Sequence, residues 1–260
     1  MAKVKALVLR TAGTNCDWET EYALKKAGAE AQRFHVHKLL GDRGLLKDYQ
    51  ILVLPGGFTY GDDISAGKIL ANILRFHLAE ALEDFLQEGK LVIGICNGFQ
   101  ALVKSRLLPA NENHLPKATL TFNDSNRFED RWVHIRVCSS KSVYVEEGEL
   151  LYLPVAHGEG KFVPRDDATI QRLKDSAQIV FRYVDEKGER AGYPHNPNGS
   201  VEDIAGICDS TGRILGMMPH PERYVEPYQH PSWARNGLDK EPDGLRLFLN
   251  AVRYAKKKLL

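Results

Sequence analysis

Long apolar runs are missing from this chain of 260 residues, and none approaches the roughly 18 uninterrupted apolar residues of a membrane helix. The first ten residues are interrupted by Lys3 and Lys5 and lack a cleavage-site pattern, which favours a buried strand over a signal peptide. A large net charge is missing too, because the 35 Lys and Arg residues nearly balance the 34 Asp and Glu residues. We therefore expect a cytoplasmic protein that binds neither nucleic acid nor a membrane.

Cysteine is scarce, and the few that occur are scattered without a C-x-x-C pair. A chain of this length can bury a sufficient core without disulfide staples, so we expect free thiols and no metal site. A Walker A loop is not found at Gly160-Lys161, because Val155 stands where the motif requires Gly and no Ser or Thr follows. We expect no cofactor in this chain.

Short apolar runs alternate with amphipathic stretches over the first hundred residues, a pattern typical of a parallel sheet covered by helices. Asp17 is expected to cap the first helix, Gly28 to end it, and Tyr22, Leu24 and Ala27 to give it core contacts. One long helix is expected near Ile69 to Gln87. The expected strands are Val4 to Leu9, Ala31 to Val36, Ile51 to Leu54 and Leu91 to Ile95.

Beyond about Leu108 the pattern changes to strand-like segments separated by turn signals. These segments are Ala118 to Phe122, Trp132 to Cys138, Leu150 to Val155, Gln178 to Val184, and a hairpin of Ile204 to Cys208 with Ile214 to Met217. A last helix is expected near Gly244 to Lys257. The fold class that follows is α/β, with a mostly parallel central sheet flanked by helices and an added antiparallel strand region. Without a linker or repeat, residues 1–260 are expected to form a single domain.

The motif Gly94-Ile95-Cys96-Asn97-Gly98 follows a buried strand directly. A nucleophile on a tight strand-to-helix turn takes strained backbone angles, and flanking glycines relieve the resulting collisions. Cys96 would then project at the carboxyl edge of the sheet, beside a helix N-terminus that favours the thiolate. The motif also fits a buried structural cysteine followed by an ordinary turn.

His220-Pro221-Glu222 follows another expected strand, so it should reach the same edge. In an extended segment, residues two apart face the same way, which would let Glu222 accept from one ring nitrogen of His220 while the other nitrogen faces Cys96. Such a triad suits nucleophilic catalysis, with His220 as general base and acid. A lone His-Pro-Glu is more often a surface turn, so the motif indicates a catalytic triad only if His220 pairs with Cys96.

Consecutive glycines follow a third expected strand, at Pro55-Gly56-Gly57-Phe58. Their backbone N–H groups can point at a small anion, so the N–H groups of Gly57 and Asn97 could form an oxyanion hole. A Gly-Gly pair is also commonly nothing more than a turn.

Taken together, these elements resemble the class I glutamine amidotransferases, which carry Gly-x-Cys-x-Gly-x-Gln and a downstream His-x-Glu. The glutaminase subunits of phosphoribosylformylglycinamidine synthases resemble the chain most closely. The matching segments span nearly the whole chain in order: Ala12 to Asp17, Pro55 to Phe58 with Tyr60 to Asp63, Gly94 to Gln100, Ala156 to Phe162, and Pro219 to Arg223.

The resemblance implies that Cys96 attacks the side-chain amide of glutamine, that His220 and Glu222 complete the triad, and that Gly57 and Asn97 stabilise the oxyanion. It also implies a purine-biosynthetic complex, in which a separate synthase subunit uses the ammonia together with ATP and magnesium, and a small subunit bridges the two. The resemblance further implies that four residues border the glutamine pocket: Gln100, Phe58, His157 and Gly158.

Other interpretations stay open at this point. A cysteine peptidase or a redox-chaperone protein can use the same elbow, although a His commonly follows the Cys there, where this chain has Asn97. A non-catalytic regulatory subunit, or an amidotransferase of another pathway, would share the fold. Cys16 is expected to be a packed thiol without a catalytic role. The segment from Glu226 to Asp243 has no assigned role and could contact a partner.

Overall fold

The computed structural model describes residues 3–110, 115–139, 141–239 and 241–260. Its main feature is a nine-stranded sheet with the order β2-β1-β3-β4-β11-β10-β9-β6-β7. Five adjacent strands run parallel to one another: β1 (Lys5–Arg10), β2 (Glu30–His35), β3 (Ile51–Leu54), β4 (Leu91–Ile95) and β11 (Ile214–Met217). The sheet continues in antiparallel fashion through β10 (Ile204–Cys208), β9 (Ile179–Val184), β6 (Glu129–Val137) and β7 (Leu150–His157). The expected α/β class, mostly parallel with an antiparallel extension, is confirmed.

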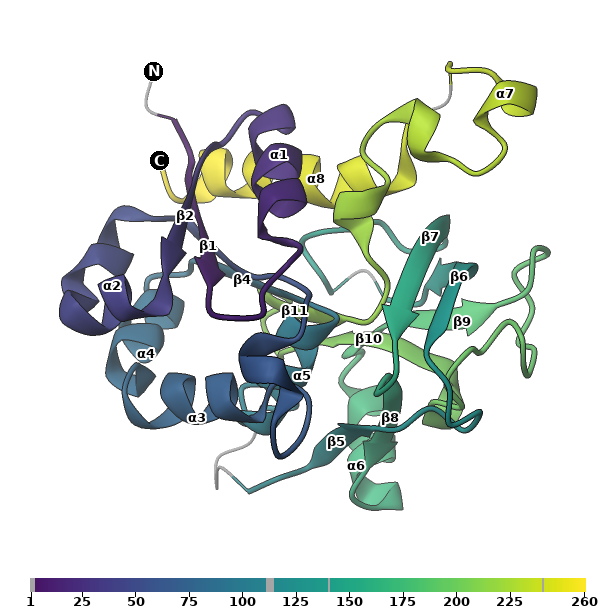
Figure 1. Cartoon of the computed structure of the whole chain (residues 1–260), viewed down its shortest axis with the longest axis horizontal. Coiled ribbons are helices and arrows are strands. Elements are labelled where there is room, and N and C mark those ends of the chain that lie inside the picture. The colour runs from purple at the N-terminus through teal and green to yellow at the C-terminus, as the bar shows by residue number, and fades with distance from the viewer. Residues whose placement is uncertain (1–2, 111–114, 140, 240) are drawn as a thin grey trace.

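Helices cover both faces of the parallel half of this sheet (Figure 1). One face carries α1 (Asp17–Lys26) and α8 (Asp243–Lys258), and the other carries α3 (Lys68–Phe76), α4 (Ala79–Gln87) and α5 (Asn97–Lys104). The antiparallel half is accompanied by a two-stranded sheet of β5 (Ala118–Thr121) and β8 (Lys161–Pro164), with α6 (Asp167–Asp175) beside β8. The remaining helices, α2 (Val36–Gly41) and α7 (Trp233–Asn236), are short. No helix in the described part of the chain is long and apolar enough to cross a bilayer.

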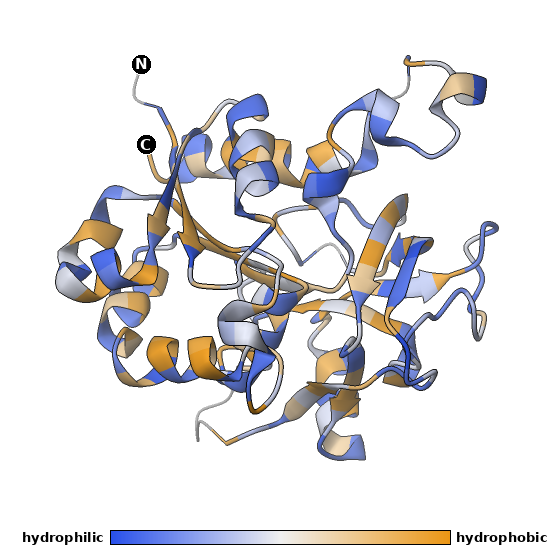
Figure 2. Ribbon diagram, viewed as in Figure 1, coloured by the Kyte–Doolittle hydropathy of each residue, from blue (hydrophilic) through white to orange (hydrophobic). Residues whose placement is uncertain are grey.

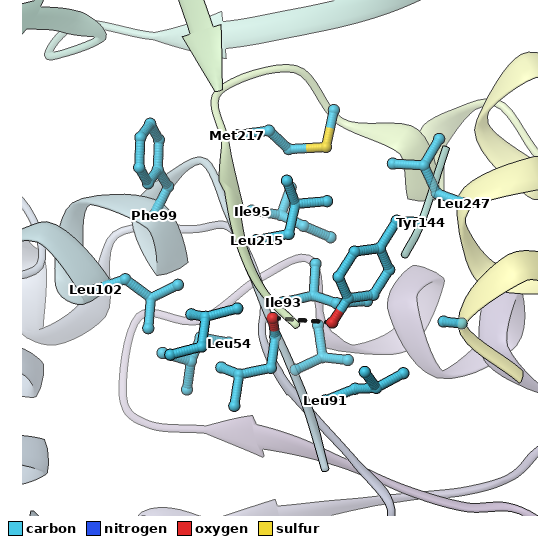
Figure 3. Close-up of a cluster of buried hydrophobic side chains, with 14 of the residues drawn as sticks. Leu54, Leu91, Ile93, Ile95, Phe99, Leu102, Tyr144, Leu215, Met217 and Leu247 are labelled. Atoms are coloured by element: carbon cyan, nitrogen blue, oxygen red, sulfur yellow. Dashed lines mark hydrogen bonds between the residues drawn. The ribbon is translucent and has the colours of Figure 1, made fainter. Parts of the chain in front are cut away.

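The central strands are apolar throughout because helices pack on both of their faces. Every residue of β3, β4 and β11 is buried, and these strands form the hydrophobic centre in Figure 2. Figure 3 shows Phe99 and Leu102 of α5 on one side of this layer and Leu247 of α8 on the other. The fully buried hydroxyl of Tyr144 lies 3.1 Å from the carbonyl oxygen of Val92, which satisfies it inside the core.

The expectation of one long helix from Ile69 to Gln87 is wrong, because the helix breaks between α3 and α4. Leu78 has a φ of −119° and is fully buried, and its N–H reaches back to the carbonyl oxygen of Ile73. The chain turns so that this leucine packs into the core. Neither Gly nor Pro marks the break in the sequence.

Two expectations about the first helix are also wrong. Cys16 holds the N-cap position of α1 and Asp17 is its first residue, where the Asp17 carboxylate pairs with Arg33 at 3.1 Å. Tyr22 is 50% exposed and donates its hydroxyl to Glu226, whereas Leu24 and Ala27 are buried as expected. Gly28 follows the helix with a φ of +95°, a conformation that favours glycine. The tertiary partners of Asp17 and Tyr22 therefore decide their roles.

Candidate active site

The carboxyl ends of the parallel strands bring four segments together at one edge of the sheet, where open α/β folds bind their ligands. Cys96 follows β4 directly, and His220 lies three residues beyond the end of β11. Gly56 and Gly57 follow β3, and Cys16 lies at the start of the helix after β1. Strand order alone therefore gathers residues that are far apart in the sequence.

The backbone at Cys96 is strained as the motif predicts, with a φ of +50° and a ψ of −105°. Glycine at position 98 is required by close packing, because an added Cβ would lie 1.8 Å from the carbonyl oxygen of Leu54. At Gly94 an added Cβ would lie 2.8 Å from the backbone of Gly98. The two glycines thus let α5 pack close to the strands and hold the nucleophile at the elbow. The Cys96 side chain is only 4% exposed, and its Sγ lies 3.6 Å from the carbonyl oxygen of Ala156.

His220 and Glu222 form a short hydrogen bond, with 2.6 Å between Nδ1 and Oε1. Both side chains are buried, and the backbone N–H of His220 donates to the carbonyl oxygen of Pro154 at 2.8 Å, which fixes the position of the imidazole. The expected extended segment is wrong: Pro221–Arg223 is a 3-10 turn, and this turn brings the carboxylate back to the ring.

The second ring nitrogen of His220, Nε2, has no hydrogen-bond partner among the described residues. Burial opposes protonation of the imidazole, but the Glu222 carboxylate and the nearby Cys96 outweigh it and raise the pKa of His220 well above its ordinary value. Because Nδ1 is engaged by Glu222, Nε2 is the nitrogen left for Cys96.

Two backbone N–H groups suit an oxyanion hole. Gly57 has a φ of +140°, and no hydrogen bond between described backbone groups uses its N–H. Asn97 is the first residue of α5, where backbone N–H groups have no acceptor within the helix. These two groups come from the ends of neighbouring strands β3 and β4.

The side chain of Asn97 belongs to a buried polar network beneath the elbow. Its Oδ1 accepts from the hydroxyl of Thr59 at 2.6 Å, and its Nδ2 donates to Asp62 at 2.8 Å and to Gln100 Oε1 at 2.9 Å. Gln100 in turn donates its Nε2 to the carbonyl oxygen of Glu159 at 2.5 Å. The network ties the segments after β3 and after β7 to the helix of the nucleophile.

His157 ends β7 and is buried next to Gly160, where an added Cβ would lie 2.4 Å from the ring. Its Nδ1 lies 3.1 Å from Asn123 Oδ1, and burial together with His220 lowers its pKa to about 3, so the ring is neutral at pH 7. Gly158 lies beside the exposed ring of Phe128, which in turn lies 6.3 Å from the ring of Phe58.

Sequence reasoning missed two neighbours of the histidine. Cys16 Sγ lies 4.0 Å from His220 Nδ1, and Arg223 donates to the same sulfur at 3.1 Å. The position of Cys16 at the carboxyl end of β1 was the available signal, because it assigns Cys16 to the same edge as Cys96. Asp62 was also missed, although it lies in the Gly-Asp-Asp motif that follows the glycine pair.

Residues 3–255 match the family model of the CobB/CobQ-like glutamine amidotransferase domain. A PurQ subunit of phosphoribosylformylglycinamidine synthase from Dehalococcoides mccartyi is 49% identical, over 99% of this chain and 100% of the relative. One from Methanococcus maripaludis is 42% identical, over 97% and 98%. A chain of the solved PurLQS structure from Thermotoga maritima superposes with a TM-score of 0.74 and 33% identity, covering 97% of this chain and 99% of that one. The chain therefore belongs to the CobB/CobQ-like glutamine amidotransferase domains and, among them, to the PurQ type.

Proposed function

We propose that this chain is the glutaminase subunit of phosphoribosylformylglycinamidine synthase and that it releases ammonia from glutamine for purine biosynthesis. The observation that carries the proposal is the strained elbow of Cys96 beside a buried His220 whose other nitrogen is bound to Glu222. The PurQ relatives, similar over nearly their full length, support the same assignment.

We propose one amidotransferase domain over residues 1–260. We also propose that it acts in the cytoplasm, where its free thiols would persist.

In the first half of the reaction the Cys96 thiolate attacks the side-chain amide carbon of glutamine, and the carbonyl electrons move onto oxygen. The backbone N–H groups of Gly57 and Asn97 stabilise this oxyanion. When the tetrahedral intermediate collapses, the carbon–nitrogen bond breaks, and the imidazolium of His220 gives its proton to the departing nitrogen. Ammonia leaves, and a glutamyl thioester remains on Cys96.

In the second half a water molecule attacks the thioester carbonyl, and neutral His220 takes one of its protons. The carbon–sulfur bond breaks, glutamate leaves, and the thiolate–imidazolium pair is restored. Glu222 holds the imidazole in one orientation and stabilises its positive charge in both halves. The reaction involves no net oxidation or reduction, and Cys96, His220 and water account for every bond and proton, so we propose that it proceeds without a cofactor on the chain.

We assign the wall of the glutamine pocket to Phe58, His157 and Gly158, and we assign Gln100 a role in holding that wall. The hydrogen bond from Gln100 to the Glu159 carbonyl oxygen supports this role, because Glu159 directly follows Gly158. The 45% exposed ring of Phe58 supports a place at the rim.

The partner that we propose is a synthase subunit, which consumes the ammonia with ATP and magnesium. The solved PurLQS structure from Thermotoga maritima, one chain of which resembles this protein, supports a synthase partner. A small subunit that bridges the two is also part of the proposal. Ammonia that escapes into water is protonated and loses its nucleophilic lone pair. Direct transfer from this chain to the synthase is therefore part of the proposal.

The replacement Cys96→Ala tests the nucleophile in the assembled complex. We expect amidation of formylglycinamide ribonucleotide with glutamine to fall by at least about a thousandfold, as for loss of other catalytic nucleophiles. Amidation with added ammonia should persist, because the synthase is intact. Cys138→Ala is the matched control, since Cys138 is another free thiol and lies outside the site. Normal glutamine-dependent activity in Cys96→Ala would refute the assignment.

A further inference from the structure

A compact set of metal-ligating atoms lies on the far side of the catalytic histidine from Cys96. Cys16 Sγ, a ring nitrogen of His220 and a carboxylate oxygen of Glu222 all lie within 4.8 Å of one another. The side chains are 1%, 1% and 0% exposed. Glu222 Oε2 has no hydrogen-bond partner among the described residues, although it is fully buried. We propose that Cys16, His220 and Glu222 form an inhibitory site for a thiophilic divalent metal ion, such as Zn²⁺.

The donor set is one that zinc prefers, with a thiolate, an imidazole and a carboxylate. Zinc–ligand bonds of about 2.0 to 2.3 Å in a tetrahedron place ligand atoms roughly 3.3 to 3.6 Å apart. Cys16 Sγ now lies 4.0 Å from His220 Nδ1, and Glu222 Oε1 lies 2.6 Å from it. These two pairs therefore need shifts of no more than about 1 Å, and the sulfur of Cys16 lies within 4.8 Å of a Glu222 carboxylate oxygen. The unpartnered Oε2 gives the carboxylate a second oxygen with which to bind.

The surroundings of Cys16 favour a soft metal over magnesium or calcium. An incoming ion must displace the thiol proton of Cys16, which now points at Asn15 Oδ1, 3.1 Å away. Only an ion with a strong bond to sulfur does this at neutral pH. Arg223 Nη2, 3.1 Å from the sulfur, can keep its hydrogen bond to the resulting thiolate.

Occupation of this site would stop the chemistry proposed for Cys96. A metal on Nδ1 displaces the proton that this nitrogen now shares with Glu222 and releases it to solvent. The neutral ring keeps its one remaining proton on Nε2, the nitrogen left for Cys96. The ring then cannot accept a proton, and Glu222 is no longer free to orient it. Inhibition rests on the proposed function, whereas metal binding by itself does not.

Cobalt binding tests the site without any activity measurement. We use the full chain with Cys96→Ala, which removes the competing thiol, and titrate Co²⁺. One equivalent should bind and give the intense near-ultraviolet band of a thiolate–cobalt bond. Adding Cys16→Ala should abolish the band and weaken binding by at least about tenfold, whereas adding Cys138→Ala should change neither. A band that survives loss of Cys16, or no band in Cys96→Ala, would overturn the proposal.

Zinc inhibition of the assembled complex tests the consequence. Glutamine-dependent activity is measured in zinc-buffered solutions, each variant relative to its own activity with excess chelator. Cys16→Ala should need at least about ten times more free Zn²⁺ for half-inhibition than the unchanged chain. If Cys16→Ala is unstable, Cys16→Ser takes its place in this assay, because serine nearly keeps the side-chain volume. Equal zinc sensitivity of Cys16→Ala and the unchanged chain would overturn the inhibitory role. If the unchanged chain showed no glutamine-dependent activity even with excess chelator, the proposed function would be contradicted, but the cobalt result would still stand.

Discussion

Two buried histidines at the same edge of the sheet have opposite electrostatic surroundings. His157 meets only a neutral amide at Nδ1, and its burial lowers the pKa to about 3. His220 is equally buried, but Glu222 and Cys96 raise its pKa well above the ordinary value. The difference separates a ring that is neutral at pH 7 from a ring whose protonated form is favoured by its neighbours.

Glu222→Gln should shift the alkaline limit of activity to lower pH. The proposed mechanism needs the imidazolium of His220, so activity falls as pH rises through the pKa of His220. Glu222 raises this pKa, and its removal therefore moves the fall downward. We also expect the maximal rate to drop by about 10²- to 10⁴-fold, as when the carboxylate of other triads is removed. The pH profile of kcat/KM, measured with chelator present, checks this, and an unshifted alkaline limb would contradict it.

His157→Asn should make the protein less sensitive to acid. The folded-state pKa of His157 is about 3, and an unfolded histidine has a pKa near 6.5. Between these values the unfolded chain binds a proton that the folded chain excludes, so the stability contributed above about pH 6.5 is lost as the pH falls toward about 3. Asparagine does not titrate, so His157→Asn should abolish this loss, which amounts to as much as about 1.4 kcal/mol of unfolding free energy for each pH unit in that range.

Urea unfolding at pH 7 and pH 4.5 measures the effect, and the exposed His77→Asn is the matched control. The same acid-induced loss of stability in His157→Asn and in the unchanged chain would count against this account.

At the scale of elements, the elbow between β4 and α5 depends on glycine for contact with β3. Gly98→Ala would place a methyl group 1.8 Å from the Leu54 carbonyl oxygen, so α5 must move away from the strand. We expect a loss of at least about 2 kcal/mol of unfolding free energy together with loss of glutamine hydrolysis, because the shift displaces Asn97.

Gly41→Ala provides the comparison for this variant, since no atom lies within 4 Å of a Cβ there. Denaturant unfolding measures the stability of both variants, and glutaminase assays measure their activity. A Gly98→Ala protein as stable and active as Gly41→Ala would show that the close approach is not required.

Four strands at the centre of the sheet were readily predicted from the sequence. The expected bounds of β3, β4, β10 and β11 agree with the structure, because their apolar runs are buried on both faces and end at turn residues. The strand β8 and the helix α6 were not predicted, and the break at Leu78 was not either. Leu78 is apolar and continues the helical pattern, so only its place in the core shows that the helix stops there.

At the scale of the whole molecule, the nucleophile is nearly closed off from solvent. Cys96 is 4% exposed and His220 is 1% exposed. Hydrogen bonds from Asn97 to Asp62 and from Gln100 to the Glu159 carbonyl oxygen hold the neighbouring segments against α5. Because the sulfur is so little exposed, the residues around it must move before glutamine can reach it.

Docking of the synthase should raise the glutaminase activity of this chain. The closed arrangement predicts a slow isolated subunit, and a partner that favours an open arrangement should increase kcat/KM by at least about tenfold. Glutamate production by the chain alone and with its synthase, with an inert protein as control, measures this. Equal rates in the three samples would contradict the prediction.

The sequence by itself determined the alternating strands, the glycine-flanked cysteine and the strand-end positions of the histidine and the glycine pair, because these depend on local patterns and on one topological rule. The tertiary structure alone decided that a 3-10 turn returns Glu222 to His220, and that Cys16 contacts a histidine 204 residues away. Contacts over such separations depend on how all the elements pack, and no local pattern encodes that packing.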